Sequence, residues 1–326
     1  MTKNIILYIF CSFVLKSVTA QNLITSDLAN FKYTFDNLQN AKNLKDTIDL
    51  IQQNVIDKAS PTFKEYLELK KQGGQNVINE YVRCLKNYPK YYRSVLDQSE
   101  IFKDKTQIKK IENAYKRLVK FYPNAKLKPN VICIGIMDDG GKPFSSGQYI
   151  GLEVFSCNEK ADKSELDNFK KDYLGGGSFD LKKIDEAITH ELVHLSQFKG
   201  DENFGKTFKG TIKYIPLLSE GGASFVTDYL YNYKATIGPG VFYQEQLDYC
   251  NKNQKQLWQD FLQEDKFNQF FWAINPKYPV QRIGYYLGYQ VCKSYLDKSK
   301  NKKQAIKDII EVTDWDSFVR KSGFGL

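Results

Sequence analysis

The chain has 326 residues and a formal net charge of +9, from 47 lysines and arginines against 38 acidic residues. This length is ample for a sizeable hydrophobic core, in one large domain or two small ones. The positive excess is modest, and the lysines are spread along the chain without a recognised nucleic-acid motif. The composition therefore does not indicate nucleic acid as a partner.

The N-terminus predicts a secretory signal peptide over residues 1–20. Lys3 supplies a positive charge, residues 5–15 form an apolar core, and Ala20 ends a small-residue cleavage site. We expect cleavage after Ala20 and a mature protein that is secreted or periplasmic. No stretch reaches the ~20 apolar residues that a spanning helix needs, so we predict no transmembrane segment in the mature chain. Of the six cysteines only Cys11 lies in the signal, and an exported chain could form one or two disulfides from the rest.

Residues 21–128 predict a helical N-terminal region. Apolar residues recur at helical spacing, without strand alternation, in four segments: 48–56, 63–69, 77–85 and 108–121. Gly73 and Gly74 are expected to end the second of these helices. The aromatic stretch 87–93 contains Pro89 and predicts a turn.

A small sheet is predicted next, from two apolar runs separated by turn-forming residues. The runs are residues 131–137 and 149–155, with glycines and a proline between them. Later segments predict helices again, at 241–249, 256–271, 284–296 and 305–310. The expected fold class is therefore α+β, predominantly helical, with residues 129–326 as a second domain.

The chain has two histidines, His190 and His194, and both lie in one H-E-x-x-H motif. Asp180 as an N-cap and apolar residues at three- and four-residue steps predict a helix here. Helical positions four apart lie on one face, so both imidazoles can reach a single Zn²⁺. Glu191 would act as general base on a zinc-bound water. The alternative is two partly exposed histidines on an ordinary amphipathic helix.

A zinc site of this type needs a third protein ligand, and no third histidine exists. The best candidate is Glu220, which follows Ser219 and precedes Gly221 and Gly222. We expect Ser219 to begin a second helix, with the glycines letting it pack closely on the first. The alternative is a solvated acid at a helix N-terminus. The motif thus predicts one Zn²⁺ per chain, held by His190, His194 and Glu220.

Peptide hydrolysis also needs a donor for the oxyanion that develops on the carbonyl oxygen. Because no histidine remains, the segment 282–289 is the best source. Gly284 and Gly288 give it a smooth helix face, and Arg282 and Tyr285 are the candidate donors. The alternative is that its tyrosines are core aromatics.

Four segments in this order resemble a loosely characterised group of predicted zinc peptidases: 150–155, 188–194, 219–223 and 282–289. The group has the gluzincin layout, in which H-E-x-x-H is followed by a helix carrying Glu. It includes relatives of the gliding-motility lipoprotein GldB and several uncharacterised zinc-dependent protease families. The resemblance covers roughly residues 130–326 and implies a zincin-like catalytic domain. It also implies an edge strand beside the active-site helix that holds an extended peptide. The alternative is a plain core sheet with no substrate role. The chain departs from the GldB relatives in lacking a convincing lipobox.

These features predict an exported zinc metallopeptidase that acts on a peptide or protein substrate. The alternative is an exported accessory or binding protein with a zincin fold and little or no turnover. The intact Glu191 favours the enzyme, because Glu191 is not needed as a ligand. A third reading is zinc-dependent hydrolysis of a non-peptide amide.

Overall fold

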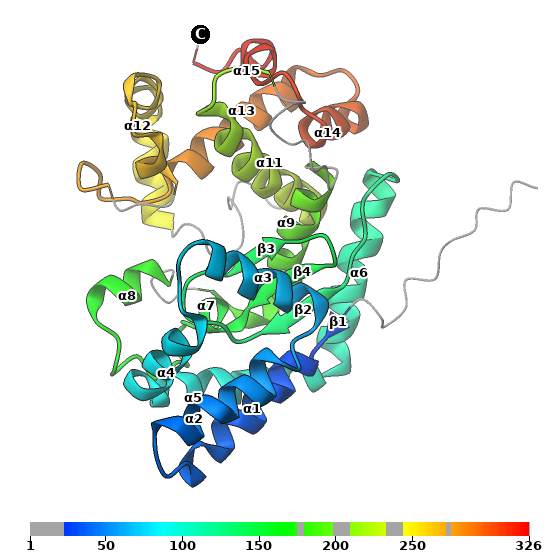
Figure 1. Cartoon of the computed structure of the whole chain (residues 1–326). Helices are drawn as coiled ribbons and strands as arrows, with labels where there is room; N and C mark the ends of the chain where they lie inside the picture. The colour runs from blue at the N-terminus through cyan, green and yellow to red at the C-terminus, as the bar shows by residue number, and fades with distance from the viewer. Residues whose placement is uncertain (1–22, 175–178, 198–208, 233–243, 272–274, 326) are drawn as a thin grey trace, which may run out of the picture.

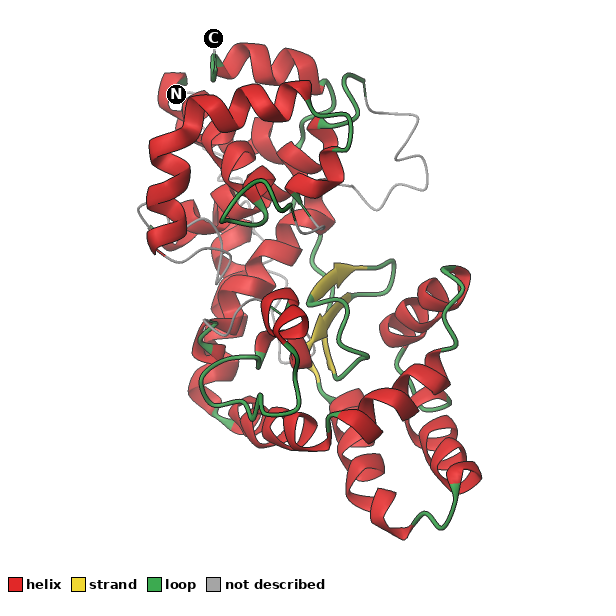
Figure 2. Ribbon diagram, turned by 90° about the vertical axis from the view of Figure 1, so that its left-hand side faces the viewer, coloured by secondary structure: helices red, strands yellow, loops and turns green. Residues whose placement is uncertain are grey.

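The computed structural model describes five stretches of the chain: residues 23–174, 179–197, 209–232, 244–271 and 275–325. Within them the protein is mostly helical and contains one four-stranded sheet (Figures 1 and 2). The predicted α+β class with a predominance of helix is confirmed. The predicted signal peptide lies outside the described residues.

The N-terminal region is a series of helices after a very short strand, β1 (Leu23–Ile24). The helices are α1 (Ser26–Asn37), η2 (Leu38–Asn40), α2 (Leu44–Ile51), the π-helical η3 (Gln52–Ile56), α3 (Pro61–Gln72), α4 (Val77–Asn87), α5 (Pro89–Gln98), η4 (Ser99–Lys103) and α6 (Lys105–Phe121). All four predicted helices are present. The turn predicted at 87–93 is wrong, because Pro89 occupies the first turn of α5, where proline is tolerated.

The sheet combines β1 with β2 (Asn130–Cys133), β3 (Gly141–Pro143) and β4 (Gln148–Gly151). Its strand order is β1-β2-β4-β3, with β1, β2 and β4 parallel and β3 antiparallel to β4. Strand β3 therefore lies at an edge. Strand β1 comes from the predicted N-terminal region and pairs with β2, which follows the expected domain boundary after residue 128. The sheet therefore contains strands from both sides of that boundary.

Both predicted strands are shorter in the structure than in the sequence-based expectation. Strand β2 ends at Cys133, and β4 ends at Gly151, after which residues 152–155 form a helical turn, α7 (Leu152–Phe155). The sequence stays apolar beyond the ends of the two strands, because Ile134, Ile136 and Leu152 are buried in the core although they are no longer in a strand. Strand β3 escaped prediction because it is short and contains glycine and proline, which are rare inside strands.

The C-terminal half is helical. Its elements are α8 (Asn168–Tyr173), η5 (Leu181–Lys183), α9 (Ile184–Gln197), α11 (Tyr214–Tyr231), α12 (Gln244–Gln263), η6 (Phe267–Phe270), α13 (Ile283–Lys298), α14 (Lys302–Ile310) and α15 (Trp315–Ser322). The helix predicted at 256–271 is replaced by the end of α12 and by η6, and residues 241–243 lie outside the described stretches. None of the described helices has the length and apolar character that crossing a bilayer requires.

Helices α1, α2, α4 and α5 lie at one side of the sheet and α11 to α15 at the other (Figures 1 and 2). Helix α3 contacts β2 and β4, α6 packs along α9, and α9 lies against β3. Within the C-terminal half, the most extensive helix packing joins α11 to α13 and to α9. Helices α11 and α13 approach closely at Gly221 and Gly288: a Cβ added at Gly221 would lie 2.5 Å from the backbone nitrogen of Tyr289. Only glycine permits such an approach. Gly284 faces elsewhere, because its added Cβ would overlap the ring of Phe271.

The cysteines do not form the expected disulfides. All five cysteines outside the predicted signal are buried free thiols: Cys84, Cys133, Cys157, Cys250 and Cys292. Each behaves as a small apolar core residue, and four of the five are 0% exposed.

Candidate metal centre

The H-E-x-x-H helix is α9, and it is buried along its whole length. Asp180 caps the short turn that leads into it, by accepting a hydrogen bond from the Lys182 backbone nitrogen at 3.0 Å. His190 and His194 are only 9% and 5% exposed. This burial does not fit the alternative of partly exposed histidines on a solvent-facing amphipathic helix.

The structure brings His190, His194 and Glu220 together. The two Nε2 atoms lie 3.0 Å apart, and each lies 3.3 Å from Oε2 of Glu220. Zinc ligands at about 2.0–2.1 Å in a tetrahedral arrangement are about 3.3–3.4 Å from one another. Two imidazole nitrogens and one carboxylate oxygen also form a common zinc donor set. The three residues therefore fit a zinc ion both in spacing and in chemistry.

Glu220 reaches this group from the second turn of α11. The helix begins at Tyr214, so the expected start at Ser219 is wrong. Pro216 lies in the first turn, where its missing N–H costs no hydrogen bond. Ser219 does not cap a terminus: its hydroxyl lies 3.4 Å from Nδ1 of His194. The Glu220 side chain is 18% exposed, which also excludes the alternative of a solvated acid at a helix end.

The charges in this group reinforce one another. Burial alone would raise the pKa of Glu220, but His194 and His190 outweigh it and hold that pKa well below its usual range. Burial would lower the pKa of His194, but Glu220 outweighs it and raises the pKa to about 9. The carboxylate is thus an anion at neutral pH, and a proton on His194 occupies the place that a cation could take.

Glu191 points its carboxylate at strand β3. A Cβ added at Gly141 would lie 2.5 Å from Cδ of Glu191 and nearer still to its Oε1. Burial raises the pKa of Glu191, and the neighbouring His194 and His190 oppose this rise. A raised carboxyl pKa suits a group that must accept a proton near neutral pH. The contact with Gly141 was not predicted, because the sequence placed this glycine in a turn.

The structure brings Tyr285 to the same group, from the first turn of α13. Burial and the neighbouring Glu220 carboxylate raise the pKa of Tyr285 well above its usual value. Arg282 lies just before α13 in a left-handed conformation, with φ 59° and ψ 29°. Its positive charge opposes part of this rise in the pKa of Tyr285. The catalytic roles of Tyr285 and Arg282 stay predictions.

Gln197 is a further residue at the centre that the sequence did not single out. It ends α9, one turn after His194, and its Oε1 lies 2.8 Å from Nδ1 of His194. Its Nε2 donates to the backbone carbonyl of Ser219 at 3.0 Å. The one available signal was its spacing of three residues from His194, which places both on one helix face.

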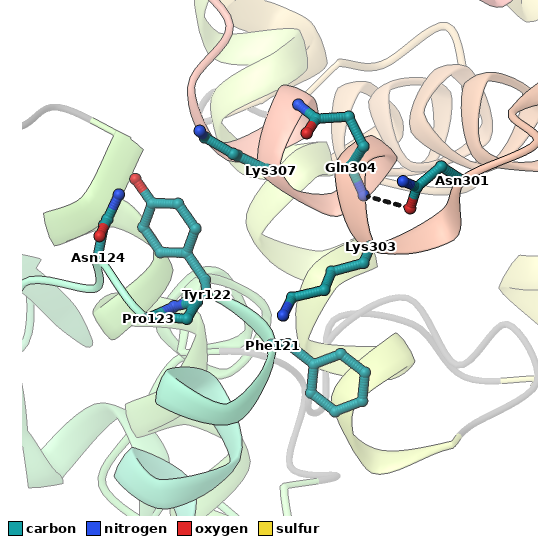
Figure 3. Close-up of a pocket in the computed structure, with 8 residues that line it drawn as sticks. All are labelled: Phe121, Tyr122, Pro123, Asn124, Asn301, Lys303, Gln304 and Lys307. Carbon is teal, nitrogen blue, oxygen red and sulfur yellow. Dashed lines mark hydrogen bonds between the residues drawn. The ribbon is translucent and has the colours of Figure 1, made fainter. Parts of the chain in front are cut away.

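A pocket of about 230 Å³ lies elsewhere, between the end of α6 and the start of α14 (Figure 3). In Figure 3 the side chains of Lys303 and Lys307 extend from α14 toward Phe121 and Tyr122. Lys307 lies 3.9 Å from Glu311, so part of its charge is balanced. The pocket shares no residue with the histidines and Glu220, so it is separate from the candidate metal centre.

No protein-family model matches the chain, and neither a curated protein nor a solved structure matches it significantly. The gluzincin resemblance therefore has the order and content of the sequence motifs as its only support. The family to which the chain belongs stays a prediction.

Proposed function

We propose that the protein is a zinc-dependent metallopeptidase. One observation carries this proposal: His190, His194 and Glu220 converge with the spacing of zinc ligands. Glu191 lies beside the two histidines on helix α9. Glu191 is not needed to complete the ligand set. Its position is the one that a general base requires, which favours an enzyme over an accessory protein.

Zinc bound by these three residues would polarise a substrate carbonyl and supply an activated water. Glu191 would accept the proton of the attacking water and later give it to the leaving amine. Its buried carboxyl and raised pKa support this role, because a carboxylate with a raised pKa is a stronger base than one in water. The missing side chain of Gly141 leaves the space that this carboxylate occupies.

Tyr285 would donate a hydrogen bond to the oxyanion as it develops. Its raised pKa keeps the phenol protonated, and therefore a donor, throughout the physiological range. Arg282 would add positive charge beside that phenol. In this proposal the Tyr285 hydroxyl, which is influenced by the Glu220 carboxylate in the structure, turns to the substrate during the reaction.

We also propose that the substrate is an extended peptide held along β3. This strand pairs with β4 on one side and has no strand partner on its other side among the described residues. An edge strand offers backbone N–H and C=O groups to which a peptide can pair. Because Gly141 lies on β3 and contacts Glu191, a peptide paired there would run past the proposed base.

The test compares wild type with Glu191→Gln in zinc content and in hydrolysis of a diverse peptide library. Glu191→Gln should keep its zinc while hydrolysis falls by orders of magnitude. Glu186→Gln, the same change on the same helix, serves as the matched control and should keep both. Equal turnover by Glu191→Gln and wild type would contradict the mechanism. A zinc-bound wild type that cleaves no peptide would instead favour the accessory or binding protein.

A further inference from the structure

The side chain of Gln197 connects the two helices that carry the metal ligands. On one side Oε1 lies 2.8 Å from Nδ1 of His194, a ligand on α9. On the other side Nε2 lies 3.0 Å from the carbonyl oxygen of Ser219 and 3.4 Å from that of Leu218, both on α11. Ser219 directly precedes Glu220, the ligand on α11. One side chain thus joins a histidine ligand to the backbone beside the carboxylate ligand.

The hydrogen-bond chemistry of this contact has one consistent assignment. Backbone carbonyls only accept hydrogen bonds, so the NH₂ end of Gln197 must face Ser219 and Leu218. The carbonyl end then faces His194 and can only accept, so Nδ1 of His194 must carry the proton. A neutral imidazole protonated on Nδ1 has its lone pair on Nε2, the atom that faces His190 and Glu220.

The packing around Gln197 supports the same orientation. Its side chain is buried, at 6% exposure, and lies against Gly222 on α11. A Cβ added at Gly222 would lie 3.1 Å from Nε2 of Gln197, so the glycine leaves the space that the amide fills. The amide is therefore almost completely shielded from water.

The two histidines differ in this respect. Nδ1 of His190 is buried and has no hydrogen-bond partner among the described residues. Nδ1 of His194 has Gln197 at 2.8 Å, with the Ser219 hydroxyl more distant at 3.4 Å. Gln197 is thus the shorter and better partner for fixing the His194 ring.

We propose that Gln197 is a positioning residue of the metal centre. It sets the tautomer and ring orientation of His194, and it fixes the position of that ring relative to the backbone next to Glu220. Partners of this kind typically contribute 10–100-fold to metal affinity. The proposal rests on the metal centre proposed above, but it does not depend on peptidase activity.

The experiment measures Zn²⁺ affinity by competition with a chelator, for wild type and three variants. Gln197→Leu removes both the acceptor and the donor at nearly constant volume, and should weaken affinity 10–100-fold. Gln197→Glu keeps an oxygen for the Nδ1 proton, and should lose less. Gln107→Leu removes another buried glutamine, 3% exposed on α6, and should stay within about threefold of wild type.

A second readout separates positioning from a general loss of stability. The chain has only two histidines, so imidazole ¹H–¹⁵N spectra of the zinc-loaded protein contain two rings to assign. In wild type the Nδ1 proton of His194 should be visible and protected from exchange by its hydrogen bond. In Gln197→Leu this proton should exchange faster, while the His190 signals stay in place.

The outcomes distinguish the two proposals. Wild-type affinity together with an unchanged Nδ1 signal in Gln197→Leu would overturn the role of Gln197 while leaving the metal centre intact. A wild-type chain that binds no zinc would contradict the metal centre, and with it the positioning role. Weakened affinity in Gln197→Leu with an unaltered His194 tautomer would show that Gln197 only holds the helices together.

Discussion

Gly141→Ala should disable the proposed base without touching any metal ligand. The new methyl carbon would lie 2.5 Å from Cδ of Glu191, whereas carbon atoms in favourable contact are about 3.5–4.0 Å apart. The Glu191 carboxylate or strand β3 must therefore move by about 1 Å or more. A misplacement of about 1 Å in a catalytic group can cost about 100-fold in rate. We expect kcat/KM to fall by roughly that factor while zinc content stays unchanged.

Gly140→Ala provides a control one residue away. Its added Cβ would meet the Val154 side chain at 3.1 Å, a contact that a small adjustment of the valine relieves. Neither glycine has a positive φ, so the backbone tolerates alanine at both positions. The assay is kcat/KM on the best peptide from the library, with zinc content and thermal unfolding measured in parallel. Wild-type turnover in Gly141→Ala would refute the placement of Glu191 as a base held against β3.

Three other predictions follow from the same structure. Glu220→Ala should weaken zinc binding far more than Glu186→Ala in chelator titrations, with Glu220→Gln in between, because only Glu220 lies within reach of both imidazoles. Tyr285→Phe should keep zinc and lower kcat about 100- to 1,000-fold if its hydroxyl stabilises the oxyanion, and an unchanged kcat would exclude that role. Burial raises the pKa of Glu153 to about 8 from 4.5. The Glu153 carboxyl therefore loses its proton at a lower pH in the unfolded chain than in the folded protein, and the free energy of unfolding should fall as the pH rises from 4.5 to 8. Urea unfolding of Glu153→Gln should show a weaker decline over that interval, and an equal decline would count against the raised pKa.

The histidine helix could be predicted because its signals are local. Asp180 caps the turn before it, apolar residues follow a helical period, and the four-residue spacing puts His190 and His194 on one face. The choice of Glu220 used more than local pattern, since it depended on the chain having no third histidine. The structure places Glu220 beside both imidazoles although the predicted start of its helix was wrong.

The error at Ser219 has a physical origin. Serine is a preferred N-cap and the following glycines weaken a helix, so the local sequence indicates a boundary there. Tertiary packing overrides this preference: Gly221 lets α11 approach α13, and Gly222 leaves room for Gln197. Residues that look like helix breakers in the sequence are thus the ones that let α11 meet its neighbours.

Contacts between distant segments could not be predicted from a single sequence. Gly141 reaches Glu191 from an edge strand, and Gln197 reaches the Ser219 carbonyl from another helix. Neither pair follows a helical or strand period, because the three-dimensional packing of separate elements creates them. The predicted lengths of β2 and β4 were wrong for a related reason, since a buried segment remains apolar after its strand has ended.

Metal content measured for wild type and His194→Ala tests the central claim most directly. Purified wild-type protein should contain about one Zn²⁺ per chain by elemental analysis, because His190, His194 and Glu220 form a complete protein ligand set. His194→Ala leaves two ligands and should lose the metal while remaining folded by circular dichroism. Equal zinc content in wild type and His194→Ala would contradict the assignment of this site.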